Sequence, residues 1–193
     1  MQNNFEIITL NKKEITDFAD ERNKLLHNAN SDWVLFLDSD EKISNLHRIA
    51  GYLFPISNEF TCYQFTRKNY FLGQFVGKDK IIRLVKKETG RWVRQVHEVW
   101  VPDDEKVGVI NTPIIHNTAD NLHDYISKIN FYSDLHAKAN MEEGKTSTLF
   151  KIIFYPPLKF IVSIIKSRNM IFSIIQSLHS FLSWSKQWIL QNA

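Results

Sequence analysis

The chain has 193 residues, of which 44% are hydrophobic, 23% are charged and 13% are aromatic. This composition fits one ordinary domain, or one domain with an appendage, and it excludes a disordered, collagen-like or low-complexity chain. A single cysteine, Cys62, excludes a disulfide framework and a cysteine-based zinc site, and fits a reducing compartment.

The net charge of +3 is divided unevenly along the chain. Residues 145–193 hold six Lys or Arg and no Asp or Glu, whereas the first 144 residues hold 18 basic and 21 acidic residues. We therefore expect a mildly acidic body and a basic, apolar tail that faces something anionic.

The N-terminus has no charged-then-apolar signal pattern, so we expect a cytoplasmic protein. The longest uncharged stretch, residues 169–185, has 17 residues and includes a glutamine, a histidine and several serines. This is too short and too polar for a confident transmembrane helix.

The first third of the chain predicts an alternation of strands and helices. Residues 5–10 predict a strand, and Thr16 or Asp17 can cap a helix that runs to about Ala29. Residues 33–37 form an unbroken apolar run, as expected for a strand that is buried on both faces. An acidic loop follows, and Ser44 begins a short helix toward Tyr52.

The middle of the chain predicts β-structure, and the end predicts helices. Runs at 60–67, 80–86, 92–100 and 107–115 are separated by Gly or Pro. Apolar residues at helical spacing follow Asn121, and the apolar region 149–190 is interrupted by a Pro156-Pro157 break. The expected class is α/β, with a mixed sheet, flanking helices and a C-terminal helical tail.

Asp38 and Asp40 are the most informative residues, because they follow the buried strand directly. Ligands of open α/β sheets bind at the carboxyl ends of strands. Carboxylates there suit Mg²⁺ or Mn²⁺, which would neutralise a diphosphate leaving group. The alternative is an ordinary turn before a helix capped by Ser44.

The stretch FADERNKLLHNANSDWVLFLDSDEKIS resembles the central segment of family-2 glycosyltransferases, which have the GT-A nucleotide-sugar-binding fold. The matching elements are Ala19 with Arg22-Asn23, the turn Ser31-Asp32-Trp33, the apolar strand, and the Asp38-to-Glu41 loop. Ser31 replaces the glycine that is usual in the turn.

Later motifs resemble the branch of that family associated with lipopolysaccharide core and other cell-envelope glycans. They are Arg83-Leu84, Val96-His97-Glu98, Ile115-His116, Pro156-Pro157 and the closing FLSWSKQW. The resemblance implies a partial GT-A domain over residues 1–120, truncated before the strands that bind the nucleotide. A helical, membrane-associating region would follow over residues 121–193.

The resemblance also implies roles for the acidic and histidine residues of these motifs. Glu98 would be the general base, with Asp103, Asp104 and Asp120 as substitutes; the alternative is a solvated residue at a strand edge. Asp38, Asp40 and His116 would hold the divalent cation, although a lone histidine is more often structural.

The remaining site residues would bind the nucleotide sugar. Arg22 and Arg83 can hold diphosphate oxygens in bidentate hydrogen bonds, or can form salt bridges with nearby carboxylates. Asn23 belongs to the same motif, and His97 would contact phosphate or orient Glu98, or would satisfy a backbone carbonyl. Sugar stacking and core packing both remain open for two tryptophans, Trp92 and Trp100.

The tail carries isolated cations among aliphatic and aromatic residues: Lys151, Lys159, Lys166, Arg168 and Lys186. This pattern suits helices that lie in the headgroup plane of an anionic membrane. A helical pair packed on the body, or a dimer interface, is the alternative, and the aliphatic content disfavours nucleic acid.

The resemblance, together with the acidic loop and the basic tail, implies a metal-dependent, inverting glycosyltransferase. It would move a sugar from a nucleotide-diphosphate donor to a cell-envelope glycan or lipid acceptor, at the inner face of the cytoplasmic membrane. Two alternatives are an inactive glycosyltransferase fragment that acts as a membrane-associated binding module, and a small peripheral membrane protein with an incidental acidic loop.

Overall fold

The computed structural model describes residues 5–10, 15–46, 49, 59–104 and 106–193. The fold divides into two compact units. The first comprises Met1–Asn69 and Lys78–His116, and the second comprises Tyr70–Gly77 and Asn117–Ala193. Most of the helix expected between Ser44 and Tyr52 lies outside the described residues.

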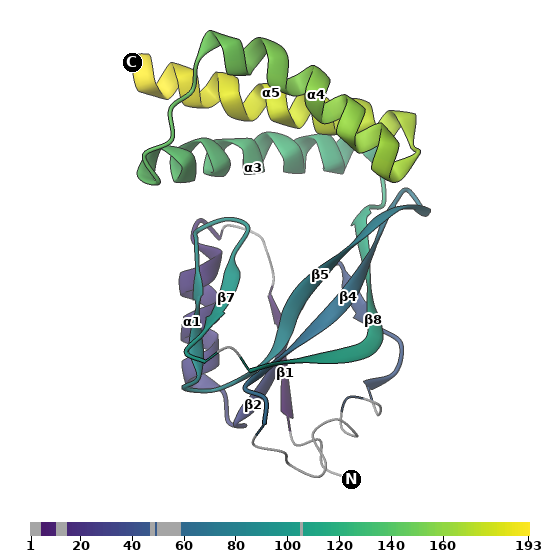
Figure 1. The fold of residues 1–193 in the computed structure, drawn as a ribbon, viewed down its shortest axis with the longest axis vertical. Coiled ribbons are helices and arrows are strands. Elements are labelled where there is room, and N and C mark those ends of the chain that lie inside the picture. The colour runs from purple at the N-terminus through teal and green to yellow at the C-terminus, as the bar shows by residue number, and fades with distance from the viewer. Residues whose placement is uncertain (1–4, 11–14, 47–48, 50–58, 105) are drawn as a thin grey trace. The chain divides into compact units, whose positions relative to one another are not determined.

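A mixed sheet forms the centre of the first unit (Figure 1). The edge strand β1 pairs in parallel with β2, and β2 pairs in antiparallel with β5. At the other edge, β3 pairs in antiparallel with β8. The spatial order is β1 (Phe5–Leu10), β2 (Trp33–Asp38), β5 (Gln74–Lys86), β4 (Cys62–Phe71), β8 (Val107–Ala119) and β3 (Glu41–Ile43). The expected α/β class is confirmed.

Strand β2 is buried on both faces, as its apolar sequence predicts. Because side chains alternate along a strand, Val34 and Phe36 enter one core while Leu35 and Leu37 enter the other. Helix α1 (Phe18–Asn28) covers the Val34 face with its own apolar residues. Asp17 caps this helix by accepting a hydrogen bond from the backbone N–H of Asp20 at 2.9 Å.

Residues 92–100 form a hairpin and not the single strand that the sequence suggests. Strands β6 (Gly90–Val93) and β7 (Val99–Pro102) pair with each other beside α1 (Figure 1). Arg94 and His97 have φ values of 76° and 55°, which interrupt the extended backbone. The turn is held by buried Val96 and by the N–H of Phe18, which donates to the Gln95 carbonyl at 2.9 Å.

The β4–β5 pair extends beyond the runs at 60–67 and 80–86, and it closes in a two-residue turn at Leu72-Gly73. Both turn residues have positive φ, 48° and 77°, which is the backbone of a type I′ turn. The turn belongs to the second unit together with the last residues of β8.

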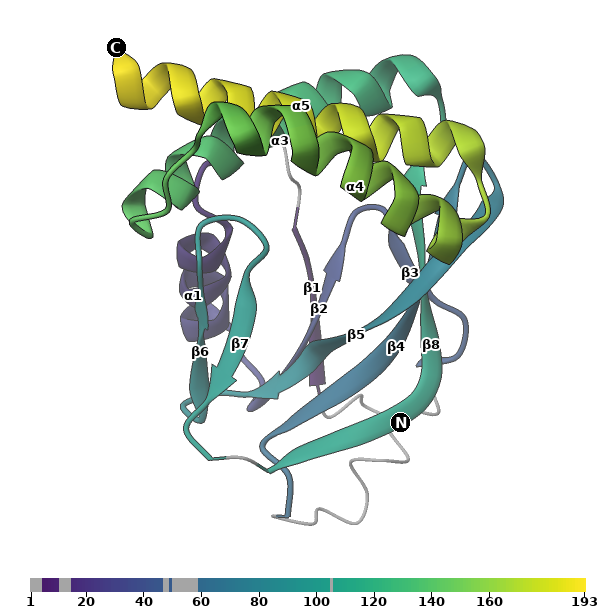
Figure 2. The same ribbon diagram turned by 45° about the horizontal axis from the view of Figure 1, so that its top comes forward.

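Three helices make up most of the second unit: α3 (Leu122–Glu142), α4 (Leu149–Ser167) and α5 (Met170–Asn192) (Figure 2). Helix α3 begins directly after Asn121, as the helical spacing predicts, and the Asn121 side chain caps it by accepting a hydrogen bond from the backbone N–H of Asp124. The expected break at Pro156-Pro157 is wrong, because α4 continues through both prolines. Packing of α4 along α5 offsets the two backbone hydrogen bonds that the prolines remove. No helix among the described residues is long and apolar enough to cross a membrane.

Candidate active site

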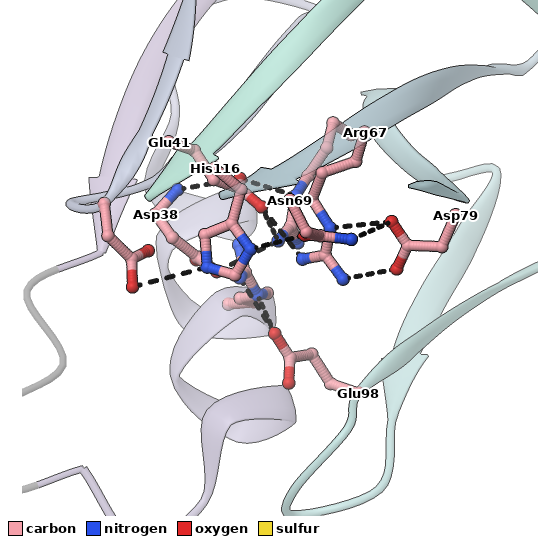
Figure 3. A network of polar contacts seen from close by, with 10 residues as sticks. Asp38, Glu41, Arg67, Asn69, Asp79, Glu98 and His116 are labelled. Atoms are coloured by element: carbon pink, nitrogen blue, oxygen red, sulfur yellow. Dashed lines mark hydrogen bonds and ion pairs between the residues drawn. The ribbon is translucent and has the colours of Figure 1, made fainter. Parts of the chain in front are cut away.

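Asp38, the last residue of β2, belongs to the polar network of Figure 3 and accepts hydrogen bonds from two buried arginines. Arg22 Nη2 donates to Asp38 Oδ1 at 2.6 Å, and Arg83 Nη2 donates to Asp38 Oδ2 at 2.9 Å. Arg22 comes from α1 and Arg83 comes from β5, and both side chains are buried. Both oxygens of the Asp38 carboxylate are therefore engaged by guanidinium groups.

Glu41, the first residue of β3, receives hydrogen bonds from two arginines. Arg83 Nε and Nη2 donate to its two carboxylate oxygens at 3.0 and 2.8 Å, and Arg67 Nη1 donates to Oε1 at 3.0 Å. Burial alone would raise the pKa of Glu41, but the charge and hydrogen bonds of Arg83, with a contribution from Arg67, lower it. Burial would lower the pKa of Arg83, but the carboxylates of Asp38 and Glu41 raise it.

Arg22 also connects Asp38 to Glu98. Its Nε and Nη2 atoms donate to Glu98 Oε1 at 3.0 and 2.8 Å, and its guanidinium group lies 5.0 Å from the Trp92 ring centroid and 5.4 Å from that of Phe36. Among the described residues, Nη1 of Arg22 has no hydrogen-bond partner. The turn at residues 94–98, which has positive φ at Arg94 and His97, places the Glu98 carboxylate beside Arg22.

A second branch of the network leads from Arg67 toward β8. Arg67 donates to both oxygens of Asp79 at 3.0 and 2.6 Å, and Asn69 Nδ2 donates to Asp79 Oδ1 at 3.3 Å. Burial would raise the pKa of Asp79, but the hydrogen bonds and charge of Arg67 lower it. The branch ends at His116, whose Nδ1 lies 2.7 Å from Asn69 Oδ1.

The bond to Asn69 determines which nitrogen of His116 is available. Because the Asn69 amide nitrogen faces Asp79, its oxygen faces His116 and must accept the Nδ1 proton. The Nε2 atom of a neutral ring is then a buried acceptor without a hydrogen bond, and it lies 3.5 Å from Asp40 Oδ2. A proton or a cation between these two atoms would interact favourably with both.

Many charged groups gather at this site. They are the carboxylates of Asp38, Asp40, Glu41, Asp79 and Glu98 and the guanidinium groups of Arg22, Arg67 and Arg83. In the described part of the chain, no three His, Cys, Asp or Glu residues form a metal-binding group. Asp40 and His116 are the two side chains here that could hold a divalent cation, with substrate phosphates and water as its further ligands.

The remaining residues singled out in the sequence lie elsewhere. Asn23 forms two hydrogen bonds of 2.9 Å with the backbone of Trp92, which fastens α1 to β6. His97 is exposed in the 94–98 turn. Both Trp92 and Trp100 are 3% exposed and pack in the core. Asp103 is exposed, Asp104 accepts a hydrogen bond from Thr61, and Asp120 belongs to the second unit.

Sequence reasoning missed the branch formed by Arg67, Asn69 and Asp79, and gave Glu41 no role. The available signal was the spacing in β4, since Arg67 and Asn69 are two residues apart and so point to the same side of the strand. Asp79 on β5 faces that side.

The sequence is similar to that of a glycosyltransferase. It is 26% identical over 152 residues to the lipopolysaccharide core biosynthesis glycosyltransferase LpsC of Rhizobium meliloti (strain 1021). The match covers 75% of this chain and 56% of the relative, so the chain spans little more than half of the relative's length. No family model matches the sequence. At a coarse level, the similarity relates the chain to a glycosyltransferase.

Proposed function

We propose that this chain is a metal-dependent glycosyltransferase with a GT-A-like sheet. It transfers a sugar, with inversion, from a nucleotide-diphosphate donor to a cell-envelope glycan or lipid acceptor of the lipopolysaccharide core type. The name of the relative and the mixed α/β sheet support this proposal. The observation that carries it is the pair of facing acceptors, Asp40 Oδ2 and His116 Nε2, beside a buried carboxylate–arginine network.

Asp40 and His116 are the proposed protein ligands of the cation. The hydrogen bond from His116 Nδ1 to Asn69 fixes the ring and its tautomer, which is the usual arrangement around a metal-binding histidine. When bound, Mg²⁺ or Mn²⁺ supplies positive charge that stabilises a departing diphosphate.

Asp38 has a different proposed role, because both of its oxygens accept hydrogen bonds from arginines. It positions Arg22 and Arg83 and thereby fixes the loop that carries Asp40. Arg22 and Arg83 have a proposed positioning role as well, because both side chains are buried and form ion pairs with carboxylates.

Glu98 is the proposed general base. Arg22 holds its Oε1 atom, and Oε2 receives no hydrogen bond from the described residues, so this second oxygen can take a proton. It removes the proton of the acceptor hydroxyl while the hydroxyl oxygen forms a bond to the anomeric carbon. The bond from that carbon to the diphosphate oxygen breaks, and the electron pair leaves with the nucleoside diphosphate.

Because the proposed acceptor is a cell-envelope glycan or lipid and nucleotide sugars are available in the cytoplasm, we propose that the reaction takes place at the inner face of the cytoplasmic membrane. A test is the release of nucleoside diphosphate, followed by ³¹P NMR, from a panel of nucleotide sugars with Mn²⁺ and core-truncated lipopolysaccharide. Loss of the base should reduce the rate about 10²- to 10⁴-fold in Glu98→Gln. The control Glu88→Gln makes the same chemical change at an exposed turn and should retain activity.

Two results would contradict the proposal. Turnover that is unchanged in Glu98→Gln removes Glu98 from the reaction. Binding of the truncated lipopolysaccharide without turnover of any nucleotide sugar would favour the alternative, an inactive binding module.

A further inference from the structure

Helix α4 has its apolar side facing outward. A helix of a water-soluble fold normally turns its apolar stripe toward the core. In α4 the buried residues are Pro156, Ser163 and Ser167. More than half of the surface is exposed for the large apolar side chains on the other side: Phe150, Ile153, Phe154, Leu158, Ile161 and Ile165.

Small polar residues line the contact between α4 and α5. Ser167 Oγ lies 3.3 Å from Ser173 Oγ, and Ser177 Oγ donates to the Pro156 carbonyl at 2.9 Å. Both pairs Ser163/Ser167 and Ser173/Ser177 have the four-residue spacing that puts small side chains on one face. Helices in lipid pack through small and hydroxyl-bearing residues in this way, because their apolar residues face acyl chains.

Helix α5 adds a second exposed apolar stripe. Its members are 39–60% exposed, and from Ile171 onward they recur every three or four residues: Met170, Ile171, Ile174, Leu178 and Phe181. Another side of α5 is occupied by α3, through Gln176 to Tyr125, Gln187 to Asn140, and Lys186 to Asn130 and Asp134. The exposed stripe is therefore separate from the packed sides of this helix.

The charges around the apolar stripes of α4 and α5 indicate which kind of surface binds there. Residues 145–193 contain six basic and no acidic residues. Lys159, Lys166 and Arg168 are exposed, and no ion pair joins them to any other described residue. Lys159 and Lys166 are seven residues apart, which is about two helical turns, so they lie on the same side of α4. This side is different from the side at the centre of the apolar stripe. A second copy of this surface would bring like charges together, whereas an anionic membrane supplies both an apolar interior and negative headgroups.

We infer that the exposed apolar faces of α4 and α5 lie in the interfacial layer of an anionic membrane, with both helices along the plane of the bilayer. Ile161 and its neighbours enter the acyl region, and Lys159 and Lys166 remain at headgroup level. This inference rests on the second unit alone and does not depend on the proposed transfer reaction.

The test measures cosedimentation of the full chain with phosphatidylcholine vesicles, with and without phosphatidylglycerol. Ile161→Asp places a charge in the proposed acyl layer and should reduce the partition coefficient at least about tenfold. Ile126→Asp on α3 makes the same change at another exposed isoleucine, 36% exposed, and should stay within about twofold of the wild type. Circular dichroism establishes that both variants are folded.

Lys166→Gln tests the electrostatic part without touching the apolar face. Removal of one charge near the surface should weaken binding about fivefold on the anionic vesicles and leave binding to neutral vesicles unchanged. The inference is overturned if the wild type does not bind the anionic vesicles, or if Ile126→Asp and Ile161→Asp are equally impaired. A dimer in sedimentation velocity that only Ile161→Asp abolishes, without vesicle binding, would assign this surface to a second copy instead.

Discussion

Replacement of Arg22 by Met should destabilise the first unit severely. The substitution keeps an apolar stem between Phe36 and Trp92 but removes the donors to Asp38 and Glu98. The Arg22 and Asp38 side chains are 0% and 6% exposed, so the variant leaves buried negative charge without one of its partners. Loss of one member of a buried pair costs about 3–5 kcal/mol in the free energy of unfolding.

Urea denaturation followed by tryptophan fluorescence measures this loss. A double-mutant cycle with Glu98→Gln should give a coupling energy of about 1–3 kcal/mol, because the two side chains share two hydrogen bonds. Lys24→Met is the matched control on the same helix, since Lys24 forms an exposed ion pair with Asp20, and its stability should equal that of the wild type. A loss below about 1 kcal/mol in Arg22→Met would refute the claim that the network is buried and mutually dependent.

Four further expectations follow from individual residues. Burial raises the pKa of the Cys62 thiol to about 11, so it should react with a disulfide reagent at pH 8 only after unfolding. Burial raises the pKa of Tyr125 to about 12; its contribution to stability should be complete below pH 10 and lost between about pH 10 and 12, and Tyr125→Phe should abolish this dependence in alkaline unfolding. Leu72→Gly should raise the free energy of unfolding by about 1 kcal/mol in urea titrations, because it relieves a left-handed leucine. Asn23→Ala should lower it by about 1–3 kcal/mol in the same assay, because the buried Trp92 backbone loses both partners.

Local signals in the sequence predicted most of the elements correctly. The Asp17 cap, the apolar run of β2 and the start of α3 after Asn121 each depend on neighbouring residues only, and the structure has them where the sequence predicts them. The hairpin at residues 90–102 was missed because positive φ at Arg94 and His97 has no glycine to mark it. The helix break predicted at Pro156-Pro157 was wrong because proline's tendency to break a helix is a local effect, and the packing of α4 against α5 outweighs it.

The site was predictable only in part. The residues Asp38, Asp40, Arg22, Arg83, Glu98 and His116 were selected from motifs. The structure joins Arg22, Arg83, Asp38 and Glu98 by direct hydrogen bonds and brings Asp40 to His116, and the residues that the sequence did not indicate connect these two sets. Their pairing was not predictable, because Arg22 and Glu98 are 76 residues apart and meet only through the 94–98 turn. Arg67 and Asp79 were missed since charged residues in strands usually face solvent, whereas here the Arg67 side chain is 20% exposed.

The most direct test of the proposed centre is a titration with Mn²⁺, monitored by the electron paramagnetic resonance of the free ion, with and without nucleoside diphosphates. The wild type should bind Mn²⁺ more tightly when the cognate diphosphate is present, and Asp40→Asn and His116→Gln should each weaken binding about 10- to 100-fold. Asp32→Asn, at an exposed turn eight residues before Asp40, is the matched control and should bind as the wild type does. Mn²⁺ binding that is unaffected by both Asp40→Asn and His116→Gln would contradict the account.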